Sequence, residues 1–142
     1  MGESIQRVAI LFSGGPAPAA NAVISSAALA FLDSGREVLG ILGGYRELQR
    51  FEATKRPLLH GVHFQRFRER DVQGARNDRG VMIGTARANP GKEIRSEEDL
   101  NDPLRTAKLA AVRAGLLELG VEALISIGGD DTLKTANFLV RY

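Results

Sequence analysis

The sequence predicts an α/β fold, built as an open parallel sheet with helices on both faces. Two short apolar runs, residues 7–12 and 123–127, each end at a pair of glycines and are followed by a segment of helical character. Continuous apolar runs of this length are typical of strands that are buried on both faces of a parallel sheet. The order strand, helix, strand along the chain is the pattern of βαβ units.

The first βαβ unit covers the N-terminal part of the chain. Residues 7–12 predict its first strand, and the alanine-rich residues 19–32 predict a buried helix. Four apolar side chains of this helix lie at helical spacing: Val23, Ala27, Ala30 and Phe31. Gly35 ends the helix, and residues 37–42 predict a second strand that runs into another glycine pair, Gly43-Gly44.

The middle of the chain has weaker patterns. Residues 45–70 show poor periodicity and form the one locally basic region, and residues 80–87 predict the end of a strand that opens into a loop of small residues. Residues 89–103 are polar and bounded by prolines, which predicts an exposed loop with at most a short helical turn. Apolar residues at spacings of three and four then predict an amphipathic helix over residues 104–119, with Gly120 as its end.

The amino-acid composition argues against several classes of protein. The 142 residues suit a single domain, and 19 basic against 17 acidic residues leave a net charge of +2, too small to indicate nucleic acid as a partner. The absence of cysteine excludes disulfides and thiolate metal sites. No apolar run approaches the roughly 18 residues of a membrane span. We therefore expect a cytoplasmic protein with neither a nucleic-acid nor a membrane partner.

Two of the glycine pairs lie where such a sheet binds ligands. In open parallel sheets, ligands bind beyond the carboxyl ends of the strands, where helix N-termini and unpaired backbone N–H groups attract anions. Gly14-Gly15 and Gly128-Gly129 both follow a predicted strand directly. Glycine allows the backbone to approach a phosphate closely, although a tight turn alone would also explain each pair.

Two adjacent carboxylates, Asp130 and Asp131, follow the second pair. They would repel a phosphate unless a cation joined them, and Mg²⁺ suits this position because it binds one or two carboxylates together with phosphate oxygens and water. A helix N-cap explains one aspartate but not both. The chain has neither G-x-x-x-x-G-K-[ST] nor G-x-G-x-x-G, which argues against a P-loop or a dinucleotide fingerprint.

Four motifs, in this order and at about this spacing, together resemble the phosphofructokinases. They are Ser13-Gly14-Gly15-Pro16-Ala17-Pro18 with Asn21, Gly44-Tyr45, Gly84-Thr85-Ala86-Arg87 and Ile127-Gly128-Gly129-Asp130-Asp131-Thr132. The resemblance spans nearly the whole chain and implies the Rossmann-like N-terminal part of a phosphofructokinase fold. It implies that residues 1–142 are a partial donor-phosphate-binding domain without the acceptor-binding domain, because the family's T-I-D-N-D motif, which carries the proton acceptor, does not occur.

The resemblance also implies residue roles. It implies catalytic roles for Arg87 and Asp130, with Asp130 as the Mg²⁺ ligand and Arg87 neutralising charge on the transferred phosphoryl group. It implies donor-phosphate contacts from eight residues: Gly14, Gly15, Tyr45, Arg87, Gly129, Asp130, Asp131 and Thr132. Tyr45 matches a position near the nucleotide base in ATP-using members. Alone, Arg87 would be interpreted as a solvated surface arginine and Tyr45 as a half-buried aromatic.

Two positions depart from the bacterial ATP-type pattern. Pro16 replaces an aspartate, as in other branches, and Asp131 replaces a glycine, which resembles the pyrophosphate-dependent branch. A carboxylate there would crowd and repel the α-phosphate of ATP, whereas pyrophosphate has no third phosphoryl group. We therefore expect transfer from pyrophosphate to fructose 6-phosphate, giving fructose 1,6-bisphosphate, by an enzyme that is a homo-oligomer when complete.

Other functions remain open at this point. They are an ATP-dependent phosphofructokinase, a non-catalytic phosphate-binding module, and a member of the NAD kinase and lipid kinase group, which shares a G-G-D loop after a strand. Nucleic-acid binding through the basic residues 46–70 is the weakest alternative, because a run of charges is usually a solvated face.

Overall fold

The computed structural model describes residues 3–15, 18–75 and 78–142, and it has the expected α/β architecture. The strands are β1 (Arg7–Ser13), β2 (Glu37–Ile41), β3 (Phe64–Arg66) and β4 (Ala123–Gly128). They form one sheet in the order β3-β2-β1-β4, in which β1 pairs in parallel with both β2 and β4. β3 pairs antiparallel with β2, so the sheet is mixed but mostly parallel.

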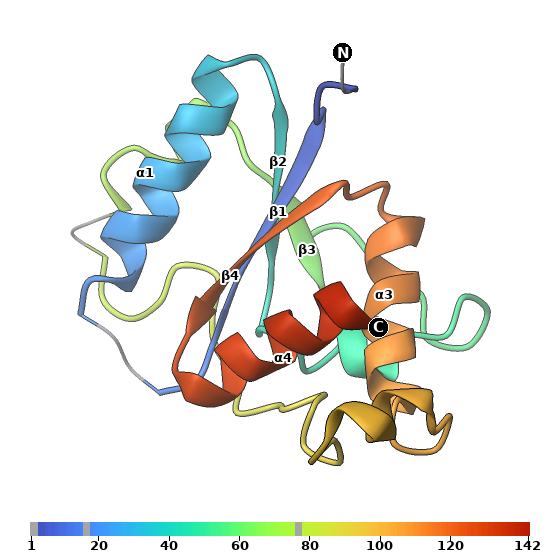
Figure 1. Ribbon diagram of the computed structural model, residues 1–142. Coiled ribbons are helices and arrows are strands. Elements are labelled where there is room, and N and C mark those ends of the chain that lie inside the picture. The colour runs from blue at the N-terminus through green and yellow to red at the C-terminus, as the bar shows by residue number, and fades with distance from the viewer. Residues whose placement is uncertain (1–2, 16–17, 76–77) are drawn as a thin grey trace.

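Helices cover both faces of this sheet (Figure 1), as the sequence predicts. The α-helices are α1 (Ala20–Asp33), α2 (Glu69–Val72), α3 (Ala107–Glu118) and α4 (Asp130–Arg141), and two 3-10 helices are η1 (Leu48–Arg50) and η3 (Glu97–Asn101). α1 and α2 pack together on one face, whereas α3, α4 and η1 lie on the other. In the described part of the chain, no helix has the length and apolar character needed to cross a membrane.

β1 is the centre of two hydrophobic layers. Its residues Ile10 and Phe12 pack with Ile24 of α1, and its residue Leu11, which points to the opposite face, packs with Val112 of α3. All five side chains are at most 2% exposed, and each such burial is worth about 1.5–3 kcal/mol. Burial on both faces is the reason why this strand is apolar at every position from Val8 to Phe12 instead of at every second one.

The predicted buried face of α1 is wrong in part: Ala27 and Phe31 pack against the core, whereas Val23 and Ala30 are exposed. The structure buries Ala20, Ile24 and Ala28, which are four residues apart, and leaves Val23 47% exposed. Both sets of residues have helical spacing, so the pattern alone does not choose between them. The small side chains of Ala20 and Ala28 on either side of Ile24 let the helix approach the sheet closely.

The middle of the chain holds two further differences from the prediction. β3 lies within residues 45–70, where two half-buried residues and one exposed residue give no period-two pattern, and residues 80–87 form a turn and loop instead of a strand end. In this loop, Gly84 N–H donates to the Val81 carbonyl at 2.8 Å, and Ile83 anchors the loop in the core at 1% exposure. A single buried anchor explains the apolar character that suggested a strand.

Candidate active site

The two predicted glycine loops lie side by side at the carboxyl ends of β1 and β4. Ser13 is paired with Gly128 at the end of the β1–β4 ladder, so the loops leave the sheet together. A Cβ atom added to Gly14 would lie 3.8 Å from the backbone nitrogen of Gly129, and Gly14 has φ +124°, which only glycine adopts readily. A Cβ atom at Gly15 would meet nothing within 4 Å, so this backbone faces open space.

The second loop is locked to the end of β1. The Thr132 hydroxyl, buried in the first turn of α4, donates to the Ser13 carbonyl at 2.9 Å. A Cβ atom at Gly128 would collide with that same carbonyl oxygen and would lie 2.6 Å from Thr132 Oγ1. Glycine at position 128 is therefore required by close packing. Because the Thr132 hydroxyl already has a partner, its predicted donor contact would rest on its backbone N–H.

Both aspartates open α4. Gly129 is the N-cap and makes no side-chain capping bond, and Asp130 and Asp131 are the first two helical residues. Both are exposed, and neither carboxylate has a hydrogen bond or ion pair within the described residues. The alternative explanation of an aspartate as N-cap is therefore not observed. Negative charge at this end of a helix is favourable by about 0.3–1 kcal/mol, which allows both carboxylates to remain unpaired.

These two carboxylates fit Mg²⁺ only as an ion shared with a phosphate ligand. Among residues 3–15, 18–75 and 78–142, no group of three or more His, Cys, Asp or Glu side chains could hold a metal ion. Two exposed carboxylates are too few for an all-protein site, but they match the binding of Mg²⁺ through one or two carboxylates together with phosphate oxygens and water. The residues present therefore suit a metal that arrives with its ligand.

The loop that carries Arg87 is tied to the first glycine loop. The Ser13 hydroxyl donates to the Ala86 carbonyl at 2.9 Å, and the Gly14 N–H donates to the same oxygen at 3.0 Å. In return, the Thr85 hydroxyl donates to the Gly14 carbonyl at 2.7 Å. The structure thus brings the Gly84-Thr85-Ala86-Arg87 motif to the first glycine loop. Arg87 is exposed, with no hydrogen bond or ion pair to any described residue.

Asn21 of the first motif and Asn89, which belongs to no motif, hold the two ends of the same loop. The buried Asn21 side chain donates to the Gly80 carbonyl at 2.6 Å and accepts from the Met82 N–H at 2.7 Å. On the other side of Arg87, Asn89 Oδ1 accepts from the Thr135 hydroxyl of α4 at 3.1 Å. Sequence reasoning assigned no role to Asn89 or Thr135. They are 46 residues apart, and no local pattern connects them.

The side chain of Tyr45, which the sequence predicts to contact the donor, is inside the core in this structure. Its side chain is fully buried, in the core layer between the sheet and α3, and its hydroxyl is 2.9 Å from the Ser126 hydroxyl. Burial raises the pKa of the Tyr45 phenol above its usual value, and the hydrogen bond with Ser126 opposes this only in part. Gly43 and Gly44, both with positive φ, turn the chain so that the ring enters the core.

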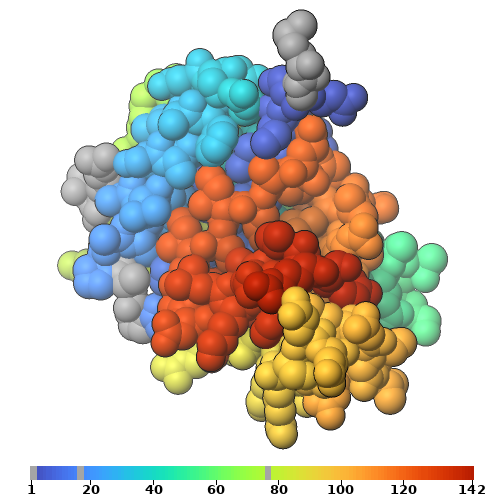
Figure 2. All heavy atoms as spheres, in the orientation of Figure 1, coloured from blue at the N-terminus to red at the C-terminus, as the bar shows by residue number. Residues whose placement is uncertain are grey.

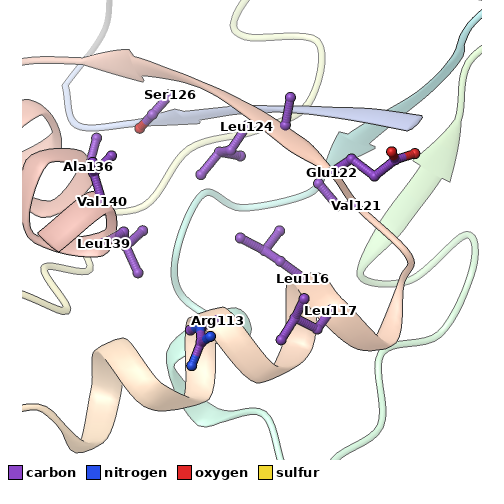
Figure 3. Close-up of a pocket in the computed structure, with 11 residues that line it drawn as sticks. Arg113, Leu116, Leu117, Val121, Glu122, Leu124, Ser126, Ala136, Leu139 and Val140 are labelled. Atoms are coloured by element: carbon purple, nitrogen blue, oxygen red, sulfur yellow. The ribbon is translucent and has the colours of Figure 1, made fainter. Parts of the chain in front are cut away.

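A hollow of about 310 Å³ lies apart from these loops, between α3, β4 and α4. On the face seen in Figure 2, the red surface of α4 lies next to the orange surface of β4 and α3. Leu116, Leu124 and Leu139 point into the hollow from these three elements (Figure 3). Its lining is mostly apolar, with Arg113 and Glu122 as its charged residues, and it includes none of the glycine-loop residues, so the hollow is separate from the candidate donor site.

Comparison with known proteins agrees with this geometry. The family model described as phosphofructokinase matches residues 7–142. The pyrophosphate–fructose 6-phosphate 1-phosphotransferase of Thermotoga maritima is 33% identical over 132 residues, which are 93% of this chain and 27% of that protein. The ATP-dependent 6-phosphofructokinase 3 of Bacteroides thetaiotaomicron is 31% identical over 131 residues, which are 92% of this chain and 34% of that protein.

The fold points to the same family. The structure of Pichia pastoris phosphofructokinase in the T-state superposes with a TM-score of 0.71 at 26% identity, covering 99% of this chain and 13% of that chain. The chain thus spans only about a third, or less, of the length of these relatives. Taken with the family match over nearly all its residues, the two adjoining glycine loops and the Arg87 loop place the chain in the phosphofructokinase family.

Proposed function

We propose that this chain binds the phosphoryl donor of a phosphofructokinase reaction, and that the donor is pyrophosphate. The acceptor would be fructose 6-phosphate, as the name of the Thermotoga relative states for that protein. The observation that carries the choice of donor is Asp131, an exposed carboxylate without a partner among the described residues, in the first turn of α4. Relatives of both kinds, pyrophosphate-dependent and ATP-dependent, are found at similar identity.

Phosphoryl transfer depends mainly on the positioning of the two reactants and on the stabilisation of negative charge. Backbone N–H groups of Gly14-Gly15 and of the first turn of α4, which lack acceptors within the helix, would bind phosphate oxygens. The planar guanidinium of Arg87 would bind two oxygens of the transferred phosphoryl group. Mg²⁺, when bound, would neutralise negative charge on the phosphates, and Asp130 is the residue that would hold it.

Asp131 supports pyrophosphate because the two donors differ beyond the second phosphoryl group. Beyond its second phosphoryl group, ATP carries a negatively charged α-phosphate, a ribose and a base. Pyrophosphate has only two phosphoryl groups and places nothing in that position. A carboxylate near that position repels and crowds ATP alone, so it lowers the affinity for ATP without weakening pyrophosphate binding to the same degree. The burial of Tyr45 agrees with this, because the side chain expected to contact a nucleotide base is inside the core.

Substituting Asp131→Gly tests the choice of donor. We expect the wild-type chain to bind pyrophosphate more tightly than ATP in the presence of Mg²⁺, as measured by isothermal titration calorimetry. We expect the substitution to shift the ratio of the two affinities toward ATP by about tenfold or more, which corresponds to about 1.4 kcal/mol. Asp131→Asn is the matched control, because it keeps the size of the side chain and removes its charge. It therefore separates the effect of charge from the effect of crowding. A wild-type chain that prefers ATP would contradict the proposal and favour the ATP-dependent alternative.

We further propose that the apolar face around β4 makes the isolated chain self-associate. β4 lies at the end of the sheet, so one of its edges is unpaired in the described structure, and Leu117 and Val140 beside it are 62% and 87% exposed. Unpaired strand edges and contiguous apolar surface favour association. We expect light scattering after size-exclusion chromatography to give a mass above 15.3 kDa that falls toward the monomer as the chain is diluted.

Two charge substitutions locate the surface responsible for this association. Val140→Glu should shift the chain toward the monomer, because it places a charge at the rim of the apolar hollow. Leu104→Glu should not, because Leu104 is equally exposed, at 89%, but does not line the hollow. Equal effects of the two substitutions would show that association is not specific to the face around β4.

A further inference from the structure

We infer that Thr85 is a positioning residue for the donor, and that its hydroxyl locks the orientation of the peptide group between Gly14 and Gly15. This inference rests on the proposed donor site. Thr85 Oγ1 donates to the Gly14 carbonyl oxygen at 2.7 Å, across 71 positions of sequence, although the threonine itself is exposed. An exposed side chain that holds the backbone of a glycine loop contributes little to the core. Its effect is therefore on the conformation of the loop.

The lock works through the geometry of one peptide group. The carbonyl of Gly14 and the N–H of Gly15 belong to the same planar unit, and in a trans peptide they point in opposite directions. No cis peptide occurs in the described residues. Holding the Gly14 carbonyl toward Thr85 therefore directs the Gly15 N–H away from Thr85. The Gly15 N–H has no acceptor within the described residues, and the backbone of Gly15 borders open space.

A glycine pair needs such a lock more than other sequences do. Glycine occupies positive and negative φ about equally, so a peptide group between two glycines rotates with little steric hindrance. If this peptide turned over, the partial negative charge of the Gly14 carbonyl would replace the Gly15 N–H at the place where a phosphate oxygen is expected. Repulsion would then replace a hydrogen bond. The Thr85 hydroxyl removes this alternative by giving the carbonyl a partner on the opposite side.

The neighbouring hydrogen bonds do not perform this task. Both the Ser13 hydroxyl and the Gly14 N–H donate to the Ala86 carbonyl, at 2.9 and 3.0 Å, and so they fix the peptide groups before Gly14 and after Ala86. In the described structure, the Thr85 hydroxyl is the donor that engages the Gly14 carbonyl. Loss of this one hydroxyl should free the Gly14–Gly15 peptide and let the adjoining bond from the Gly14 N–H to Ala86 open more often, while the hydrogen bonds of Asn21 and Asn89 still hold the two ends of the Arg87 loop.

The test compares Thr85→Val, which keeps the shape and removes the hydroxyl, with Thr85→Ser, which keeps the hydroxyl. Each ¹⁵N-labelled chain is titrated with pyrophosphate in the presence of MgCl₂ and followed by NMR. We expect Thr85→Val to weaken pyrophosphate binding by about tenfold, the usual range for one lost hydrogen bond to a ligand site, and to abolish the downfield shift of the Gly15 amide proton on binding. Thr85→Ser should stay within about threefold of the wild type and keep the shift.

A matched control separates this role from a loss of stability. Thr106 also donates its hydroxyl to a backbone carbonyl, that of Asp102, at 2.9 Å, but it does so at the start of α3. Thr106→Val should lower the melting temperature at least as much as Thr85→Val, because Thr106 is 3% exposed, and should leave pyrophosphate affinity and the Gly15 shift unchanged. Wild-type affinity together with a wild-type Gly15 shift in Thr85→Val would overturn the inference.

A second readout does not depend on the donor. The Gly14 N–H donates to the Ala86 carbonyl, so its hydrogen exchange without ligand reports whether the junction between the two loops is ordered. We expect at least tenfold faster exchange in Thr85→Val than in the wild type, and wild-type exchange in Thr85→Ser. If the wild-type chain binds neither pyrophosphate nor ATP, the proposed function fails. The hydrogen-exchange rate of the Gly14 N–H then tests by itself whether Thr85 holds the Gly14–Gly15 peptide. Faster exchange in Thr85→Val supports the lock, and unchanged exchange overturns it.

Discussion

Replacing Asp130 by alanine is expected to lower the Mg²⁺-dependent affinity of this chain for pyrophosphate by more than tenfold and to leave the fold intact. The proposed site has at most two carboxylates for the metal, so the loss of Asp130 removes much of the protein's contribution to metal binding. The structural cost is small, because the side chain is exposed and makes no capping bond. Only its interaction with the helix dipole is lost, about 0.3–1 kcal/mol.

Calorimetry with and without Mg²⁺ measures the change in pyrophosphate affinity, and circular dichroism checks the fold. Asp33→Ala is the matched control, since Asp33 is another exposed aspartate, at the last residue of α1 and on the opposite face of the sheet from α4. It should leave the affinity unchanged. If the Asp130→Ala chain keeps the Mg²⁺ dependence of the wild type, Asp130 is not the metal ligand, and its role is confined to the N-terminus of α4.

The second large effect concerns turnover. We expect no phosphorylation of fructose 6-phosphate by the 142-residue chain alone, even where it binds pyrophosphate. Phosphoryl transfer needs donor and acceptor held in line, and such positioning is worth roughly 7–11 kcal/mol of the barrier. The chain carries the proposed donor loops and Arg87, but the T-I-D-N-D motif of the family's proton acceptor does not occur in its sequence.

A chimera distinguishes a chain without an acceptor site from one whose donor site is inactive. In the chimera, residues 7–142 replace the matching region of the Thermotoga relative, which supplies the rest of a phosphofructokinase. We expect the chimera to form fructose 1,6-bisphosphate from pyrophosphate, as followed by ³¹P NMR, and we expect Asp130→Ala to remove most of that rate. Turnover by the chain alone that Asp130→Ala abolishes would show that residues assigned to loops build an acceptor site.

Much of the geometry of the candidate donor site was predictable because its elements follow from local patterns. The apolar run that became β1 is buried on both faces, and the run that became β4 packs against both core layers although its residues are only partly buried; such apolar strands need no partner information to be recognised. The glycine pairs directly after them had to lie at the same edge of the sheet once the strands were parallel. Asp130 and Asp131 at the start of a helix follow from the same logic. The sequence by itself therefore determined the class of fold and the place of the two glycine loops.

Only the tertiary structure decided which side chains meet across long stretches of sequence. The buried face of α1, the core position of Tyr45, and the contact between Thr85 and Gly14 each depend on which segments pack together. Periodicity reports how a residue relates to its neighbours within a few positions, and it carries no information about a partner 71 residues away. The same limit applies to β3, whose three residues form a strand because the edge of β2 offers them hydrogen-bonding partners.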